Sequence, residues 1–166
     1  NFRFKSPDNK VIDNAAIVPS TITKELALYV IMYSPMQMAA DLPEHYLKHP
    51  QAFEFIKNVP VDWSEKVVID SKIGSHIILA RKDKFSENWY LGGITNQESR
   101  TVKLDFSFLE DDKIYNLNIF QDTDNTHWKE NPMKYEVVSR LISSNSTIDL
   151  TMAEGGGFAI EITVTK

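Results

Sequence analysis

FAIEITV, residues 158–164, is the stretch of this chain in which apolar and other side chains alternate most regularly. Its large apolar residues, from Phe158 to Val164, all fall on even positions. Because successive side chains of a strand point to opposite faces, this alternation is typical of a β-strand with one buried face. Three glycines precede it, and glycine accepts backbone angles that other residues avoid. The stretch therefore predicts a turn followed by a strand.

The same period of two recurs upstream, in short runs separated by polar or glycine-containing turn segments. The apolar partners are Ile77 with Leu79, Trp89 with Leu91, Val102 with Leu104 and Phe106, Leu117 with Ile119, Tyr135 with Val137, and Ile148 with Leu150 and Met152. No long helix is available between these runs for parallel crossovers. We expect a mainly β fold: about eight strands in an antiparallel, Greek-key-like β-sandwich over residues 66–165.

The N-terminal third of the chain has a different pattern. Residues 1–19 are rich in turn formers and predict an extended loop. Hydroxyl residues between positions 20 and 23 then offer capping groups for a helix over residues 24–33. That helix is apolar nearly all round, so it requires burial on more than one side.

Two prolines divide the segment that follows. Pro35 disfavours helical geometry at the residue before it, so we expect a break and then one further helical turn over residues 36–40. A second short helix should begin at Pro50, because proline suits the first helical position. Its spacing places Phe53 and Ile56, with Ala52 beside them, on one side.

These patterns join two unlike parts in one chain. Residues 1–59 hold a loop and helices that are too small to bury their own faces, and residues 60–166 hold a β domain with its own core. A length of 166 residues leaves no room for a second domain of ordinary size. The helical part therefore needs a neighbour.

Charge and composition exclude several classes of partner. The net charge is −5, from 18 basic and 23 acidic residues, and no run of lysine or arginine occurs. We therefore expect neither nucleic acid nor an anionic membrane as a partner. The longest apolar run, residues 26–33, is far shorter than the ~20 residues that cross a bilayer. The absence of cysteine excludes disulfides and thiolate chemistry.

Aromatic and histidine residues offer the first candidate sites. Trp63, Trp89 and Trp128 are candidates for a sugar-stacking platform, but Trp89 lies in an alternating run and packing in a core or at an edge is favoured. The four histidines are His45, His49, His76 and His127. Only His45 and His49 have the one-turn helical spacing of a metal pair, and they lie in a predicted loop beside Pro50, so exposed surface positions are the default.

Acidic residues in loops offer the next candidates. Asp122, Asp124 and Asn125 could supply oxygens to Ca²⁺, but the loop lacks the rest of an EF-hand pattern, and a solvated loop is favoured. Asp41 and Glu44 are a conceivable acid pair for glycoside hydrolysis, although two carboxylates so close in sequence are more often polar residues at a helix end.

Two further motifs predict no chemistry. Residues 154–157, EGGG, precede a strand and not a helix, so they predict a turn and not a phosphate loop. Ser34 lies in no nucleophile-elbow context. The residues alone therefore predict no catalytic, cofactor-binding or metal-binding position in this chain.

The order of several segments carries a resemblance to a known family. These segments are STITKELALYVIMYSPMQMAADLPEHY (residues 20–46), FIKNVPVDWSE (55–65), VVIDSKIGSHIILARK (67–82), NWYLGGITNQESRTVKLDFSFL (88–109) and MAEGGGFAIEI (152–162). Taken in this order, they resemble the C-terminal end of glycoside hydrolase family 97 enzymes. The resemblance covers nearly the whole chain from Pro19 onward.

The resemblance implies a parent chain of three parts: an N-terminal β-sandwich, a catalytic (β/α)₈ barrel and a C-terminal β domain. It implies bacterial, periplasmic, calcium-dependent enzymes that act as α-glucosidases or α-galactosidases on terminal α-glycosidic bonds. The family's catalytic carboxylates and calcium ligands lie upstream of the matched segments, so none falls on this chain. Residues 1–59 would then be a loop and helices from the end of the barrel.

Two functions of different classes follow from the resemblance. In the first, residues 60–166 form a non-catalytic domain that supports the barrel and helps to build a homo-oligomer. In the second, they form a carbohydrate-binding module that holds oligosaccharide near the barrel. Both predict that this chain alone is inactive and holds no cofactor.

Overall fold

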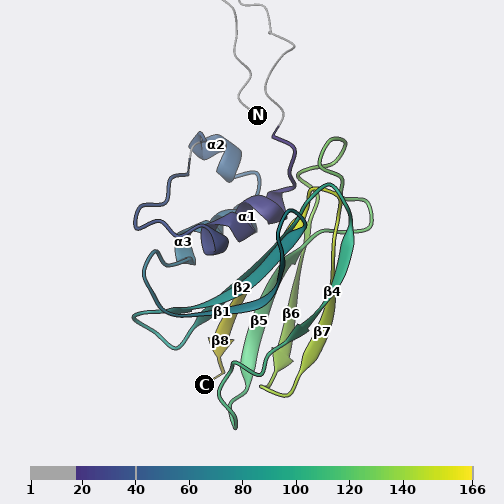
Figure 1. Cartoon of the computed structure of the whole chain (residues 1–166). Helices are drawn as coiled ribbons and strands as arrows, with labels where there is room; N and C mark the ends of the chain where they lie inside the picture. Colours follow the sequence, from purple (N-terminus) through teal and green to yellow (C-terminus); the bar gives the residue numbers. More distant parts are fainter. Residues whose placement is uncertain (1–17, 40, 166) are drawn as a thin grey trace, which may run out of the picture.

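The computed structural model describes residues 18–39 and 41–165, in which a helical part lies on one side of a β-sandwich (Figure 1). The helices are α1 (Ile22–Ile31), α2 (Pro43–Tyr46) and α3 (Pro50–Asn58). The strands are β1 (Trp63–Lys72), β2 (His76–Asp83), β3 (Trp89–Thr95), β4 (Arg100–Asp105), β5 (Tyr115–Gln121), β6 (Glu136–Ile142), β7 (Thr147–Met152) and β8 (Gly157–Val164).

The strands form two antiparallel sheets, which confirms the predicted β-sandwich of eight strands. One sheet has six strands in the order β1-β2-β3-β8-β5-β6, and the other consists of β4 and β7. The regular stretch 158–164 falls in β8, which lies between β3 and β5 in the middle of the larger sheet. Its even-numbered residues Phe158, Ile160 and Ile162 are fully buried.

The two faces of the larger sheet bury different sets of side chains. Ile78 and Ala80 of β2 point into the space between the sheets, which we call the inter-sheet core, and Leu79 points to the other face. The inter-sheet core also holds residues of β4 and β7 such as Leu104 and Met152. Period-two alternation thus separates two cores within single strands.

Helix α1 lies across the outer face of the larger sheet and contributes to a second core, which we call the helix-side core (Figure 1). Thr21 caps the start of α1, because its side-chain oxygen accepts a hydrogen bond from the backbone N–H of Lys24 at 3.3 Å. Leu26 and Val30 are buried against the sheet. The sheet thus covers one side of α1. Burial of each such side chain stabilises the fold by about 1.5–3 kcal/mol.

Two details of the helical part differ from the sequence-based expectations. Residues 36–39 form no helical turn, because Ser34 Oγ and Gln37 Nε2 bond to nearby backbone atoms and satisfy them without a helix. The short helix α2 follows instead at Pro43. Helix α3 begins at Pro50 as expected, but it buries Ala52 and Phe55, because the sheet meets a different face of the helix.

The boundary between residues 59 and 60 stays a prediction, as does the origin of residues 18–59 in a barrel. The helices α1 and α3 share the helix-side core with β2, β3, β5 and β8. The expected loop over residues 1–19 lies mostly outside the described residues. No helix of the described part of the chain is long and apolar enough to cross a membrane.

Candidate functional site

Asp122 lies directly after β5 and is buried, so the expectation that this part of the loop is solvated is wrong at this position. One carboxylate oxygen accepts a hydrogen bond from Thr23 Oγ1 of α1. The other, Oδ2, accepts from the backbone N–H groups of Ala153 at 2.9 Å and Gly157 at 3.0 Å. Asp122 therefore connects the start of α1 to the turn before β8.

The geometry of that turn depends on small residues. Gly155 has a φ of +62°, which a residue with a side chain rarely adopts. A Cβ on Gly156 would overlap Asp122 Oδ2. The EGGG motif is thus a turn, as predicted, and its glycines make room for the carboxylate.

Burial raises the pKa of the Asp122 carboxyl above its usual range, although the hydrogen bonds from Thr23 and the two backbone N–H groups oppose this shift. Lys24 lies on the same helix end, and its Nζ donates to Thr95 O at 2.9 Å. Burial lowers the pKa of Lys24. The arrangement is a buried polar link between elements, with every carboxylate oxygen bonded.

The other acidic candidates are not brought together. Asp124 and Asn125 are exposed. Asp41 accepts from the Leu42 backbone N–H at 2.8 Å and contacts His45 Nδ1 at 2.6 Å. Within residues 18–39 and 41–165, no group of three His, Asp or Glu side chains is placed to hold a metal ion.

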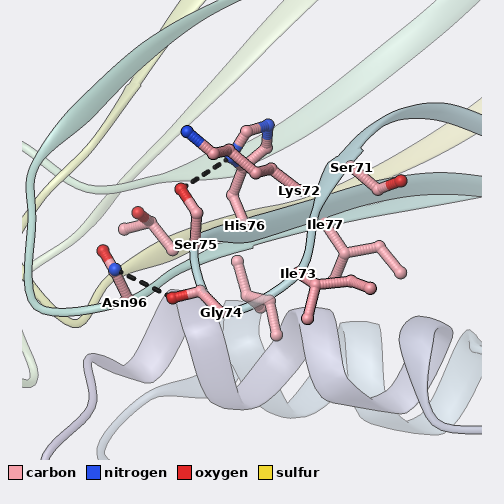
Figure 2. A pocket seen from close by; sticks show the side chains of 10 residues that line it. Ser71, Lys72, Ile73, Gly74, Ser75, His76, Ile77 and Asn96 are labelled. Atoms are coloured by element: carbon pink, nitrogen blue, oxygen red, sulfur yellow. Dashed lines mark hydrogen bonds between the residues drawn. The ribbon is translucent and has the colours of Figure 1, made fainter.

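His76 is the histidine for which a surface position was the wrong expectation, because only 8% of its side chain is exposed. Its Nδ1 lies 3.1 Å from Ser75 Oγ, and its Nε2 lies 3.0 Å from Asp70 Oδ2. Ser75 and His76 border a cavity of about 460 Å³ at the turn between β1 and β2. Figure 2 shows Ser75 beside His76, with Ile73 and Ile77 on the side nearer to the helix.

Ser75, His76 and Asp70 are linked in the order of a catalytic triad, but they resemble a triad in no other respect. Asp70 is exposed, with 58% of its side chain accessible to solvent. The N–H of Ser75 already donates to Lys72 O, and the N–H of Asn96 donates to Ser75 O. These two N–H groups are therefore not available as oxyanion donors. The three linked side chains instead hold the β1–β2 turn in place.

The three tryptophans lie in three different environments. Trp89 is buried in the inter-sheet core. Trp63 packs against Tyr90 on the helix side, with ring centroids 5.9 Å apart. Trp128 stacks with His127 in a loop at 5.8 Å. They do not form one sugar-stacking platform, which agrees with the favoured prediction of core or edge packing.

Large apolar side chains gather instead on the segment after α1, residues 32–47, which we call the apolar segment. Its members are 57–77% exposed: Met32, Tyr33, Met36, Met38, Leu42 and Leu47. Concentration of so many large apolar groups on one short surface segment is typical of an interaction site.

Arg81 lies beside the start of the apolar segment. It is only 9% exposed, its guanidinium donates to Ile31 O at 3.2 Å, and its Nε has no hydrogen-bond partner. The Cζ atom lies 5.7 Å from the ring centroid of Tyr33 and 5.8 Å from that of Trp63. This cation sits at the C-terminal end of α1, where the helix dipole is favourable for positive charge.

A protein-family model described as glycosyl-hydrolase 97 C-terminal, oligomerisation, matches residues 62–163. The chain belongs to this family. The matched residues begin just before β1 and end within β8, so they comprise both sheets of the sandwich.

Two larger proteins are similar to this chain over most of its length. A retaining alpha-galactosidase of Bacteroides thetaiotaomicron is 38% identical over 142 residues, which are 86% of this chain and 21% of that protein. A family 97 glycoside hydrolase of Pseudoalteromonas sp. strain K8, solved in complex with panose, has a TM-score of 0.86 at 40% identity. That match covers 89% of this chain and 23% of the solved one, so the chain spans about a fifth of these relatives.

A more distant structure shares the fold alone. A beta-arabinopyranosidase has a TM-score of 0.69 at 24% identity and covers 86% of this chain. The match extends beyond the sandwich that the family 97 C-terminal model covers, so the arrangement of helices on this sandwich is not confined to close relatives.

Sequence reasoning missed two residues of this family 97 domain, Asp122 and Arg81, as buried polar groups. Asp122 was considered only as an oxygen donor to Ca²⁺. The partners that bury it are 31 to 99 positions away in sequence. No local pattern predicts such a link. The run of three glycines at residues 155–157, which lies beside Asp122 in the structure, is the one signal of close packing in the sequence.

Proposed function

We propose that this chain is the non-catalytic C-terminal part of a family 97 glycosidase, where it supports the catalytic barrel of the parent chain and holds copies of the enzyme together. The apolar segment, residues 32–47, carries this proposal. Water-exposed apolar surface is costly, at about 25 cal/mol per Å². A neighbouring part of the parent chain would cover these side chains.

Arg81 supports the same contact. The Arg81 guanidinium is only 9% exposed, and its Nε has no hydrogen-bond partner. An acidic or carbonyl group of the barrel, placed beside Tyr33, would meet the part of this guanidinium that stays accessible and dock the helical part in one orientation. The helices would then lie between the barrel and the sheet.

The parent enzyme would hydrolyse terminal α-glycosidic bonds of oligosaccharides, as an α-glucosidase or an α-galactosidase. This part of the proposal draws on the names of the matched proteins, one a retaining alpha-galactosidase and one a family 97 hydrolase solved with panose. Ca²⁺ in the upstream parts and a bacterial periplasmic location belong to the proposal through the family alone.

The proposal predicts that the chain has no hydrolytic activity of its own. The purified chain is incubated with aryl α-glucosides and aryl α-galactosides, with and without Ca²⁺, and release of the aryl group is measured. We expect no release above buffer, because Asp41 of the candidate acid pair bonds to the Leu42 N–H and to His45.

The intact alpha-galactosidase relative serves as a positive control for the assay. Turnover that co-purifies with the chain, and that disappears when Asp41 and Glu44 are replaced by Asn and Gln, would contradict a non-catalytic role. Those two residues are the acid pair that the sequence offers.

A further inference from the structure

The six-stranded sheet ends in two edge strands, β1 and β6. An edge strand presents backbone N–H and C=O groups that have no partner in the sheet, and it is a template for a strand from another chain. A bulge in the edge strand is one way in which proteins prevent such pairing. The two edges of this sheet differ in this respect.

Strand β1 is interrupted. Its pairing with β2 shifts register between Trp63 and Glu65 and again between Val68 and Asp70. Each bulge bends the strand and breaks the row of backbone groups. This edge is therefore protected against pairing with another strand.

Strand β6 is regular. All seven of its residues pair with β5 without a shift, from Glu136 opposite Gln121 to Ile142 opposite Tyr115. Leu141 on this strand is 67% exposed. The strand offers an edge without bulges, which is the kind that accepts a partner strand.

The charges of β6 are complementary to one another. Glu136 and Arg140 are both exposed and lie on the same face, four positions apart. Glu136 accepts a hydrogen bond from Gln121 Nε2 at 2.5 Å. Among the described residues, Arg140 has no carboxylate within ion-pair distance, as the ion pairs of the chain lie elsewhere.

We infer that a second copy of this chain pairs with β6 in antiparallel register, with Val138 opposite Val138 of the other copy. This register sets Glu136 of each copy opposite Arg140 of the other, so that two ion pairs form across one two-fold axis. It also sets the exposed Leu141 opposite Tyr135. The inference rests on the proposed function, since it names the surface through which the oligomer forms.

A second copy fits this edge better than an unrelated segment. A two-fold interface must be self-complementary, because the same patch serves both subunits. The Glu136 and Arg140 pair satisfies that condition. Strand β4 also has a free edge, but its Lys103 already lies opposite Asp149 of β7 within the chain. The description of the family as an oligomerisation domain agrees with this choice.

A charge-swap cycle tests the register. The dissociation constant of self-association is measured by sedimentation velocity for the chain and for Arg140→Glu, Glu136→Arg and the double variant. The reference chain and the three variants all carry Met36→Ser and Met38→Ser, so that the apolar segment does not drive association. Each single swap sets like charges opposite one another twice per dimer, and we expect about tenfold weaker association. The double swap restores opposite charges and should restore the affinity.

Lys66→Glu is the matched control, a charge reversal at an exposed position of the other edge strand, β1. It should leave the dissociation constant unchanged. Hydrogen exchange of the amides of residues 136–142 should slow as protein concentration rises. An oligomer whose affinity ignores both single swaps, or whose double variant stays as weak as the single ones, overturns the β6 register and leaves the proposed function intact. A chain that stays monomeric overturns the proposed oligomerisation and the register with it.

Discussion

At the scale of single residues, Asp122 is the side chain that links the most distant parts of the fold. It is 7% exposed and accepts hydrogen bonds from a helix and from the turn before β8. Its position next to Gly156 could not be predicted from sequence, because the contact depends on how β5 and β8 pair. The local sequence predicted only that a turn lies at residues 154–157.

Replacement of Asp122 by Ala should destabilise the chain by about 2–4 kcal/mol, because it leaves two backbone N–H groups buried without an acceptor. Asp122→Asn should cost much less. The amide oxygen can accept from both N–H groups, and the amide nitrogen can donate to Thr23 Oγ1, which has Thr21 Oγ1 within 2.7 Å as a further partner. Urea unfolding at neutral pH measures both changes.

The pH dependence of the free energy of unfolding, measured for the native chain and for Asp122→Asn, tests the raised pKa. The pKa of the Asp122 carboxyl is higher in the folded chain than its ordinary value of 3.8. Its protonation therefore contributes to the free energy of unfolding below pH 3.8, and this contribution is lost as pH rises through the folded pKa. The stability of the native chain relative to Asp122→Asn should therefore fall as pH rises from about 3 toward neutrality. A relative stability that rises over this window would show that the hydrogen bonds outweigh burial.

At the scale of elements, alternation predicted the strands well because it is a local property of the chain. It did not predict which strands are neighbours, so the edge position of β6 emerged only from the structure. The helical part was less predictable. The sheet selects Ala52 and Phe55 as the buried face of α3, and side-chain bonds from Gln37 replace the expected turn after Pro35.

The close approach of α1 to β3 gives a prediction at this scale. A Cβ on Gly92 would lie 2.8 Å from Ala27 O and 3.2 Å from Val30 Cβ. Gly92→Ala should therefore push α1 away from the sheet and destabilise the chain by about 1–3 kcal/mol. Urea unfolding gives the cost, and hydrogen exchange of the α1 amides shows whether the helix moves.

Gly74→Ala is the control for this change, because open space surrounds that position and only its φ of +76° resists a side chain. It should cost about 1 kcal/mol and leave exchange in α1 unchanged. Equal loss of protection in α1 for both variants would contradict direct contact between the helix and Gly92.

At the scale of the whole molecule, we propose that two surfaces of this family 97 C-terminal domain make different contacts. The apolar segment beside Arg81 faces the rest of the parent chain in our proposal, and the edge of β6 faces a second copy. The net charge of −5 and the lack of a lysine- or arginine-rich run predict that nucleic acid is not a partner. Neither surface was predictable from periodicity, because exposure and edge position depend on the complete fold.

The mass of the chain in solution shows whether this domain holds two copies together. Light scattering on the chain with Met36→Ser and Met38→Ser, over a series of concentrations, reports whether the β domain itself associates. We expect a mass of about twice the 19.0 kDa of one chain at the higher concentrations. A mass of 19.0 kDa throughout the series would show that the β domain does not associate.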